Sequence, residues 1–202
     1  MNNEGEIMQL SIFDYYLVVV NILGFFLFTV NQLSYSLRKK VHFDTAVGVV
    51  VFFGGSAGVM LAILLLGKKA VKENMMFRVF ALCMFVMQVV LWLIAEGRIR
   101  DEISLDFIGF FAGHRYLMIY LVAVNFITVI AFGADKIASM AAKSRIRIIT
   151  LLGLAYMGGS AGGLIAMYVF RHKTKKKYFT VGIPLIMVMQ VFVVFYLMNM
   201  EI

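Results

Sequence analysis

The sequence predicts an all-α integral membrane protein built from two tandem homologous units, each with three apolar helical segments. Of its 202 residues 62% are hydrophobic, the mean hydropathy is +0.92, and there is one proline. Water would not keep such a chain dispersed as a lone soluble domain. Most of the chain lies in apolar stretches of roughly 20 residues, the helix length that crosses a hydrocarbon core of about 30 Å. A sequence repeat at an offset of 104 residues predicts the two units.

Six apolar stretches follow one another, and each is long enough for a membrane helix. Backbone N–H and C=O groups find no water partner in hydrocarbon, so the stretches are expected to be helical. They lie at roughly 13–33, 46–66, 77–95, 116–134, 148–170 and 181–199. The polar connection 96–115 carries Ile103, Phe107, Phe110 and Phe111, which predict a short amphipathic segment at the interface.

The repeat consists of two patterns at one offset. Tyr-Leu-Val-x-Val-Asn occurs at 16–21 and again at 120–125, and Gly-Gly-Ser-Ala-Gly occurs at 54–58 and again at 158–162. Each copy therefore reads as an apolar helix, a basic loop, a glycine-centred segment, a second basic loop and an apolar helix.

Beyond the glycines the best offset becomes 102, which pairs Gln88 with Gln190. The shift places two additional loop residues in the first copy. We therefore predict a first membrane repeat at 1–96, a connecting amphipathic segment at 97–115 and a second membrane repeat at 116–202.

One set of motifs runs through the second copy: Asn125, Phe132-Gly133-Ala134-Asp135-Lys136, Arg145-Ile146-Arg147, Gly158-Gly159-Ser160-x-Gly162, and Arg171-His172-Lys173-Thr174 followed by Phe179. This set resembles the bacterial membrane family named domain of unknown function 1294. The first copy is degenerate, with Asn31-Gln32 in place of Asp-Lys and Gly67-Lys68-Lys69-Ala70 in place of Arg-His-Lys-Thr. The resemblance implies a membrane location and no established reaction.

Two topologies are open for the glycine-centred segments. If all six segments cross the membrane, the 19 Lys and Arg residues divide into 8 and 11 between its sides; if each glycine segment turns back, they divide into 16 and 3. The second division satisfies the positive-inside rule and favours re-entrant segments with cytoplasmic basic loops in the cell membrane. In the straight alternative, the paired glycines Gly54 with Gly58 and Gly158 with Gly162 form close-packing helix faces.

Polar residues inside the apolar segments are predicted to hold helices together. An amide without a partner in hydrocarbon costs about 2 kcal/mol or more, so Asn21 and Asn125 require partners, and Gln88 and Gln190 are the candidates. The predicted structural residues of the first copy are Asn21, Gly54, Gly55, Ser56 and Gly58.

The candidate ligand-binding residues lie in the second copy. Ser160, like Ser56 in the first copy, is expected to cap the returning half-helix and leave its amides available to an anionic group. Asp135 is interpreted either as a helix-end charge or as a carboxylate that shares a site with Arg171 or His172. The predicted substrate-binding residues are Asn125, Asp135, Lys136, Gly158, Gly159, Ser160, Gly162, Arg171, His172, Lys173 and Thr174.

Other classes of site find little support in the sequence. Cys83 is the single cysteine, and His42, His114 and His172 share no ligand spacing, so we predict neither a metal nor a cofactor. No catalytic signature is present, and we assign no catalytic residue. The net charge of +8 indicates loops that contact anionic membrane lipids rather than nucleic acid, and a homo-oligomer is compatible with this architecture.

The leading functional hypothesis is a small transporter or channel-like protein for an anionic or lipid-related solute. The solute would bind at the glycine turns, with Arg171, His172 and Lys173 at the cytoplasmic mouth. The first alternative is a non-transporting scaffold that binds anionic lipid headgroups through its basic loops. The second is a lipid-modifying enzyme that uses Asp135 and His172. A cavity at mid-membrane favours transport, and a dry, packed interior favours the scaffold.

Overall fold

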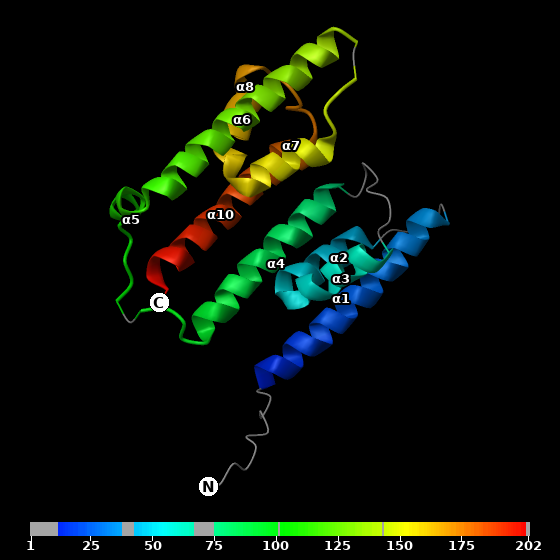
Figure 1. The fold of residues 1–202 in the computed structure, drawn as a ribbon. Helices are drawn as coiled ribbons and strands as arrows, with labels where there is room; N and C mark the ends of the chain where they lie inside the picture. Colours follow the sequence, from blue (N-terminus) through cyan, green and yellow to red (C-terminus); the bar gives the residue numbers. More distant parts are fainter. Residues whose placement is uncertain (1–11, 38–42, 67–74, 101, 143, 201–202) are drawn as a thin grey trace. The chain divides into compact units, whose positions relative to one another are not determined.

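In the computed structural model, the described residues form helices joined by turns and loops, with one isolated backbone bridge between Ile99 and Met200. The described residues are 12–37, 43–66, 75–100, 102–142 and 144–200. Within them, six helical segments are long and apolar enough to cross a membrane, which confirms the predicted all-α, multi-pass architecture (Figure 1). Large apolar side chains such as Leu64 (75% exposed) and Val169 (69%) cover their surfaces, as expected when lipid is the solvent.

The chain divides into two compact units, Met1–Phe85 and Val86–Ile202, and the division falls within α4. The first unit contains α1 (Ile12–Ser36), α2 (Asp44–Val50), the π-helical turn η1 (Val51–Gly55), α3 (Ser56–Leu66) and the first part of α4 (Met75–Ala95). Part of the basic loops of the first copy lies outside the described residues. This part holds the Lys and Arg residues at 38–40, 68, 69 and 72, and with them the Gly67-Lys68-Lys69-Ala70 stretch.

The second unit continues from α4 through a short helix in the polar connection. Its helices are α5 (Phe107–Gly113), α6 (Arg115–Met140), α7 (Ile148–Leu154), the π-helical turn η3 (Ala155–Gly159), α8 (Ser160–Val169), α9 (Lys177–Thr180) and α10 (Gly182–Asn199). Helix α5 starts after Asp106, whose Oδ1 accepts a hydrogen bond of 2.8 Å from the Gly109 N–H.

Each glycine-centred segment is broken at the first glycine of its Gly-Gly-Ser pattern. Gly54 has φ +115° and Gly158 has φ +114°, a left-handed region that only glycine adopts without steric cost. The break separates α2 from α3 and α7 from α8, so each segment consists of two short helices joined by a turn.

Helix α8 runs parallel to α6, in contact with it along its length. Contacts join residues 37 positions apart: Tyr120 with Met157, Asn125 with Gly162, and Asp135 with His172. The start of α7 lies at the same end of α6, because the Ile146 N–H donates to Asp135. The α7–η3–α8 segment, here called the second hairpin, therefore begins and ends beside Asp135. Its turn lies beside Asn125, ten residues or about 15 Å away along α6.

The first unit repeats this arrangement with α1 in place of α6. The Tyr16 hydroxyl donates to the Phe53 carbonyl (2.6 Å), and the Gly58 N–H donates to Asn21 Oδ1 (2.7 Å). Both pairs are again 37 positions apart, and both are 104 positions before their counterparts in the second unit. We call α2–η1–α3 the first hairpin.

Helix α10 crosses the second unit in the opposite direction to α6 and α8. Phe179, just before it, packs edge-on against Phe132 of α6 with ring centres 5.6 Å apart. Gln190, in its middle, reaches the hairpin turn, and Asn199 at its end accepts from the Ser104 N–H (2.6 Å) in the connection before α5. Helices α6 and α10 therefore extend past the hairpin turn to the side on which α5 lies (Figure 1).

Candidate functional site

Asn125 of α6 holds the turn of the second hairpin. Its Nδ2 donates to the Leu121 carbonyl (2.7 Å) and the Gly158 carbonyl (2.9 Å), and its Oδ1 accepts from the Gly162 N–H (2.6 Å). Asn125 therefore caps α8 from a neighbouring helix. The expected cap by Ser160 is not made, since α8 has no side-chain cap within its own sequence.

Gln190 of α10 holds the other side of the turn. Its Nε2 donates to the carbonyls of Ala155 (2.8 Å) and Tyr156 (3.1 Å), and its Oε1 accepts from the Ser160 hydroxyl at 2.5 Å. The expectation that Gln190 would pair with Asn125 was wrong. Instead, Asn125 of α6 and Gln190 of α10 each donate hydrogen bonds to carbonyls of the turn. The broken helix leaves these carbonyls without intrahelical partners.

The remaining glycines of the turn permit close approach to α6. A Cβ at Gly159 would overlap the Thr128 hydroxyl, and a Cβ at Gly162 would overlap the Asn125 carbonyl. In the first unit, a Cβ at Gly58 would overlap the Asn21 carbonyl in the same way. The straight helix with a packing face of Gly158 and Gly162 is therefore not observed, because the helix is broken at Gly158, but Gly162 does pack closely against α6.

A cavity of about 520 Å³ lies beneath the turn of the second hairpin, and we call it the tip pocket. It extends from Gly158, Ser160 and Ala161 along the first half of α6 and the second half of α10 toward Phe107 and Phe111 of α5. The pocket therefore lies on the side of the turn away from Asp135. Most of its lining is aliphatic, aromatic or methionine side chains.

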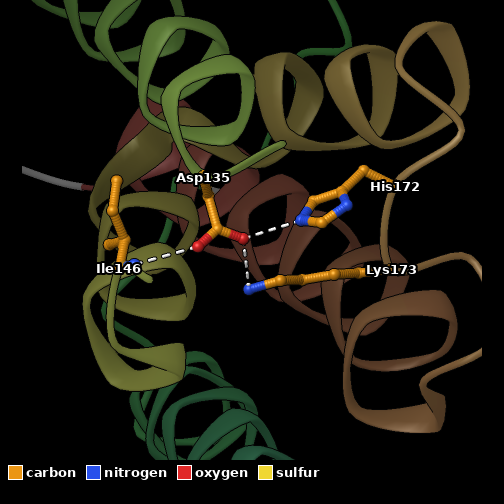
Figure 2. A network of polar contacts seen from close by, with 4 residues as sticks. All are labelled: Asp135, Ile146, His172 and Lys173. Atoms are coloured by element: carbon orange, nitrogen blue, oxygen red, sulfur yellow. Dashed lines mark hydrogen bonds and ion pairs between the residues drawn. The ribbon is translucent and has the colours of Figure 1, made fainter. Parts of the chain in front are cut away.

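Asp135, near the end of α6, ties together both ends of the second hairpin (Figure 2). Its Oδ1 accepts from the Ile146 N–H (2.9 Å), and its Oδ2 lies 2.7 Å from His172 Nε2 and 2.8 Å from Lys173 Nζ. We call these four residues the Asp135 clamp. Asp135 is completely buried, whereas the His172 and Lys173 side chains are 12% and 14% exposed.

The clamp is electrostatically balanced. The Lys173 ammonium compensates the Asp135 carboxylate and also lies 4.9 Å from the centre of the Phe179 ring. An ionised carboxylate only accepts hydrogen bonds, so His172 contributes its Nε2–H and directs Nδ1 away from Asp135. A buried carboxylate requires such partners, because desolvation of an isolated charge costs several kcal/mol.

The loop after α8 adopts an unusual backbone in order to deliver these side chains. Arg171 has φ +45° and Lys173 has φ +61°, and for residues other than glycine each such conformation costs on the order of 1 kcal/mol. With these two left-handed residues in the loop, the His172 and Lys173 side chains point toward Asp135 and the Arg171 side chain is exposed.

The structure brings together only some of the substrate-binding residues predicted from the sequence. Asp135 joins His172, as one alternative expected, but its cationic partner is Lys173 rather than Arg171. Lys136 and Thr174 are half-buried. Sequence reasoning missed the bond from Tyr120 to the turn, although the tyrosine occurs at the same place in both copies of the repeat.

The first unit has a different clamp at the equivalent position. Asn31 stands where the second unit has Asp135, and its Oδ1 accepts from the Phe43 N–H (2.8 Å). Its Nδ2 donates to Asp44 Oδ1 (2.8 Å), and the Tyr35 hydroxyl donates to Asp44 Oδ2 (2.5 Å). The carboxylate has thus moved from the long helix to the start of the hairpin, and the described part of this clamp contains no basic side chain.

Comparison with known proteins finds one family and one relative. The sequence model of a family described as "Protein of unknown function (DUF1294)" matches residues 125–179. The uncharacterized protein YsdA of Bacillus subtilis (strain 168) is 37% identical over 71 residues, which cover 35% of this chain and 80% of that protein. No solved structure matches the chain. The family match runs from Asn125 to Phe179 and so includes the second hairpin and the whole Asp135 clamp.

Proposed function

We propose that this chain, which belongs to the DUF1294 family of proteins of unknown function, is a small membrane transporter for an anionic or lipid-related solute. The residues that match the family contain the second hairpin. The solute binds beside the glycine turn of the second hairpin. The basic residues around the Asp135 clamp form the cytoplasmic mouth of the pathway.

The proposed topology has two re-entrant hairpins. Both ends of the second hairpin lie beside Asp135, so a membrane that contains α6 and α10 would be entered and left by the hairpin on one side. That side carries the basic loops and is cytoplasmic by the positive-inside rule. The shared contacts at an offset of 104 support an origin of the two units by tandem duplication.

The observation that carries the proposal is the broken helix at Gly158 beside the tip pocket. Irregular backbone at hydrocarbon depth is tolerated where it is buried in protein or borders a cavity. Discontinuous helices at mid-membrane form the substrate sites of many transporters. A non-transporting scaffold would have no need of a cavity at this depth.

The topology is tested by labelling single cysteines with a membrane-impermeant thiol reagent in intact cells. The background is Cys83→Ser, and the cysteines replace the exposed residues Arg98, Arg147 and Lys175. We expect labelling at Arg98→Cys only, because Arg147 precedes α7 and Lys175 follows α8 on the cytoplasmic side. If the second hairpin crossed the membrane, one of the two cysteines that flank it would also be labelled.

Transport is tested in vesicles of phosphatidylethanolamine and phosphatidylglycerol with a trace of NBD-labelled phosphatidylglycerol. Dithionite bleaches only the outer leaflet, so bleaching that continues past this fraction reports movement across the bilayer. We expect Arg171→Ala to slow it about fivefold, since one basic residue near anionic headgroups is worth ~1 kcal/mol. Lys175→Ala is the control, because Lys175 is equally exposed but farther along the loop from the clamp.

Two results would contradict the transport proposal. Bleaching that stops at the outer leaflet with the unmodified protein would favour the scaffold alternative. An equal loss with Arg171→Ala and Lys175→Ala would mean that surface charge in general, rather than a mouth beside the clamp, attracts the lipid. Insertion and abundance are checked in each variant by the thiol-labelling pattern.

A further inference from the structure

We propose that the tip pocket holds an acyl chain, so that the solute is a lipid-like amphiphile with its apolar tail beneath the hairpin turn. This inference rests on the proposed function, because it names the chemical class of the solute. The pocket residues on α5 and α10 do not belong to the set of substrate-binding residues predicted from the sequence.

The side-chain amides of Asn125 and Gln190, at the roof of the pocket, already have hydrogen-bond partners. Both N–H groups of Asn125 donate to carbonyls, and its oxygen accepts from Gly162. The Gln190 amide donates to two carbonyls and accepts from the Ser160 hydroxyl. A strongly polar ligand would lose its hydration here and displace one of these bonds. An apolar ligand needs no hydrogen bond in return.

The remaining surface of the pocket suits a flexible apolar chain. Phe107 and Phe111 of α5 line it toward its far end, and methionines such as Met157 and Met187 line its sides. Methionine side chains are flexible and polarisable and adapt to ligands of irregular shape. The volume of about 520 Å³ falls within the roughly 300–1,000 Å³ of small-molecule sites.

The position of the pocket favours a membrane lipid as the source of the chain. It is bordered by the halves of α6 and α10 that lie between the hairpin turn and α5, within segments that are apolar enough to cross a membrane. Acyl chains surround such segments at high concentration. Transfer of each methylene from water into an apolar site is favourable, so an amphiphile that is delivered from solution would also be retained.

The test uses the full chain in vesicles with a palmitic acid probe that carries a photoreactive diazirine and a terminal alkyne. After irradiation, the cross-linked residues are mapped by mass spectrometry. We expect cross-links at Leu121 and Val194, which line the pocket and are half-buried, above those at Ile127 and Ile130, which are exposed on α6 outside the pocket lining. Ile127 and Ile130 thus report ordinary lipid contact.

The decisive variant is Ala161→Phe, which places an aromatic ring in the pocket. We expect it to reduce cross-linking at Leu121 and Val194 at least fivefold and to leave Ile127 and Ile130 unchanged. Ala57→Phe is the matched control, because Ala57 is the equivalent exposed residue of the first hairpin and does not line the pocket.

Pocket cross-links no stronger than those at Ile127, or equal in Ala161→Phe and Ala57→Phe, would overturn the acyl-chain assignment. The outcome is separable from that of the transport experiment. Pocket labelling that responds to Ala161→Phe supports the acyl-chain site even if dithionite bleaching stops at the outer leaflet. Bleaching beyond that leaflet together with unlabelled pocket residues would leave transport standing and overturn this inference.

Discussion

Replacement of Asp135 by alanine is expected to destabilise the protein by about 3–5 kcal/mol, because it leaves the Lys173 ammonium, on a side chain that is only 14% exposed, without its counter-charge. The same change frees the Ile146 N–H and His172, so both ends of the second hairpin lose their common anchor. The measurement is the free energy of unfolding in mixed micelles titrated with SDS, followed by circular dichroism.

The double variant Asp135→Ala with Lys173→Met separates the charge effect from lost packing. It removes the stranded ammonium and keeps most of the side-chain volume, so we expect it to recover about 2 kcal/mol relative to Asp135→Ala alone. A loss of less than about 1 kcal/mol in Asp135→Ala would instead be typical of a solvated surface ion pair. That result would contradict the buried clamp.

Replacement of Gly162 by alanine is expected to cost about 1–3 kcal/mol through overpacking. The new Cβ would overlap the backbone carbonyl of Asn125, which cannot rotate away as a side chain can, so α8 would be pushed from α6. The displacement would also break the bond from the Gly162 N–H to Asn125 Oδ1. Thermal unfolding in detergent, followed by circular dichroism, measures the effect.

Gly163→Ala is the matched control in the same helix. The nearest atoms to its Cβ would be side-chain atoms of Ile183 and Thr128 at 3.5 Å and of Phe132 at 3.7 Å, which are ordinary van der Waals distances. We expect a neutral effect or a gain of up to about 1 kcal/mol, since alanine has the higher helix propensity. Equal melting temperatures for Gly162→Ala and Gly163→Ala would show that the contact between α6 and α8 is looser than the structure has it.

Much of the architecture was accessible from the sequence because hydrophobic length is a local property. The apolar stretch predicted at 148–170 is observed as α7, η3 and α8 between Ile148 and Val169, and the Gly-Gly-Ser pattern coincides with the break. The break needs glycine because Gly158 has φ +114°. Asn125 was recognised as a residue that must find a partner, because an amide in hydrocarbon is costly without one.

The groups to which Asn125 and Gln190 bond could not be predicted from local sequence. Asn125 was assigned to Gln190, whereas each of the two amides bonds to backbone groups of the hairpin turn. The prediction considered side chains alone, but a broken helix exposes carbonyls and N–H groups that compete for the same amides. Once the turn is placed between α6 and α10, these backbone groups are nearer.

By itself, the sequence determined an all-helical, multi-pass membrane protein with a glycine-centred fifth apolar stretch, because segment length, polarity and glycine content act locally. It left open whether that stretch is straight or broken, and the structure shows the break at Gly158. Only the tertiary structure decided that α8 runs parallel to α6 and that Asp135 binds Lys173 in place of Arg171. The choice between these two residues, which are two positions apart, depends on two left-handed backbone conformations, at Arg171 and Lys173. Such conformations are stabilised by contacts with a carboxylate 36 or more residues away in the chain, which local sequence does not encode.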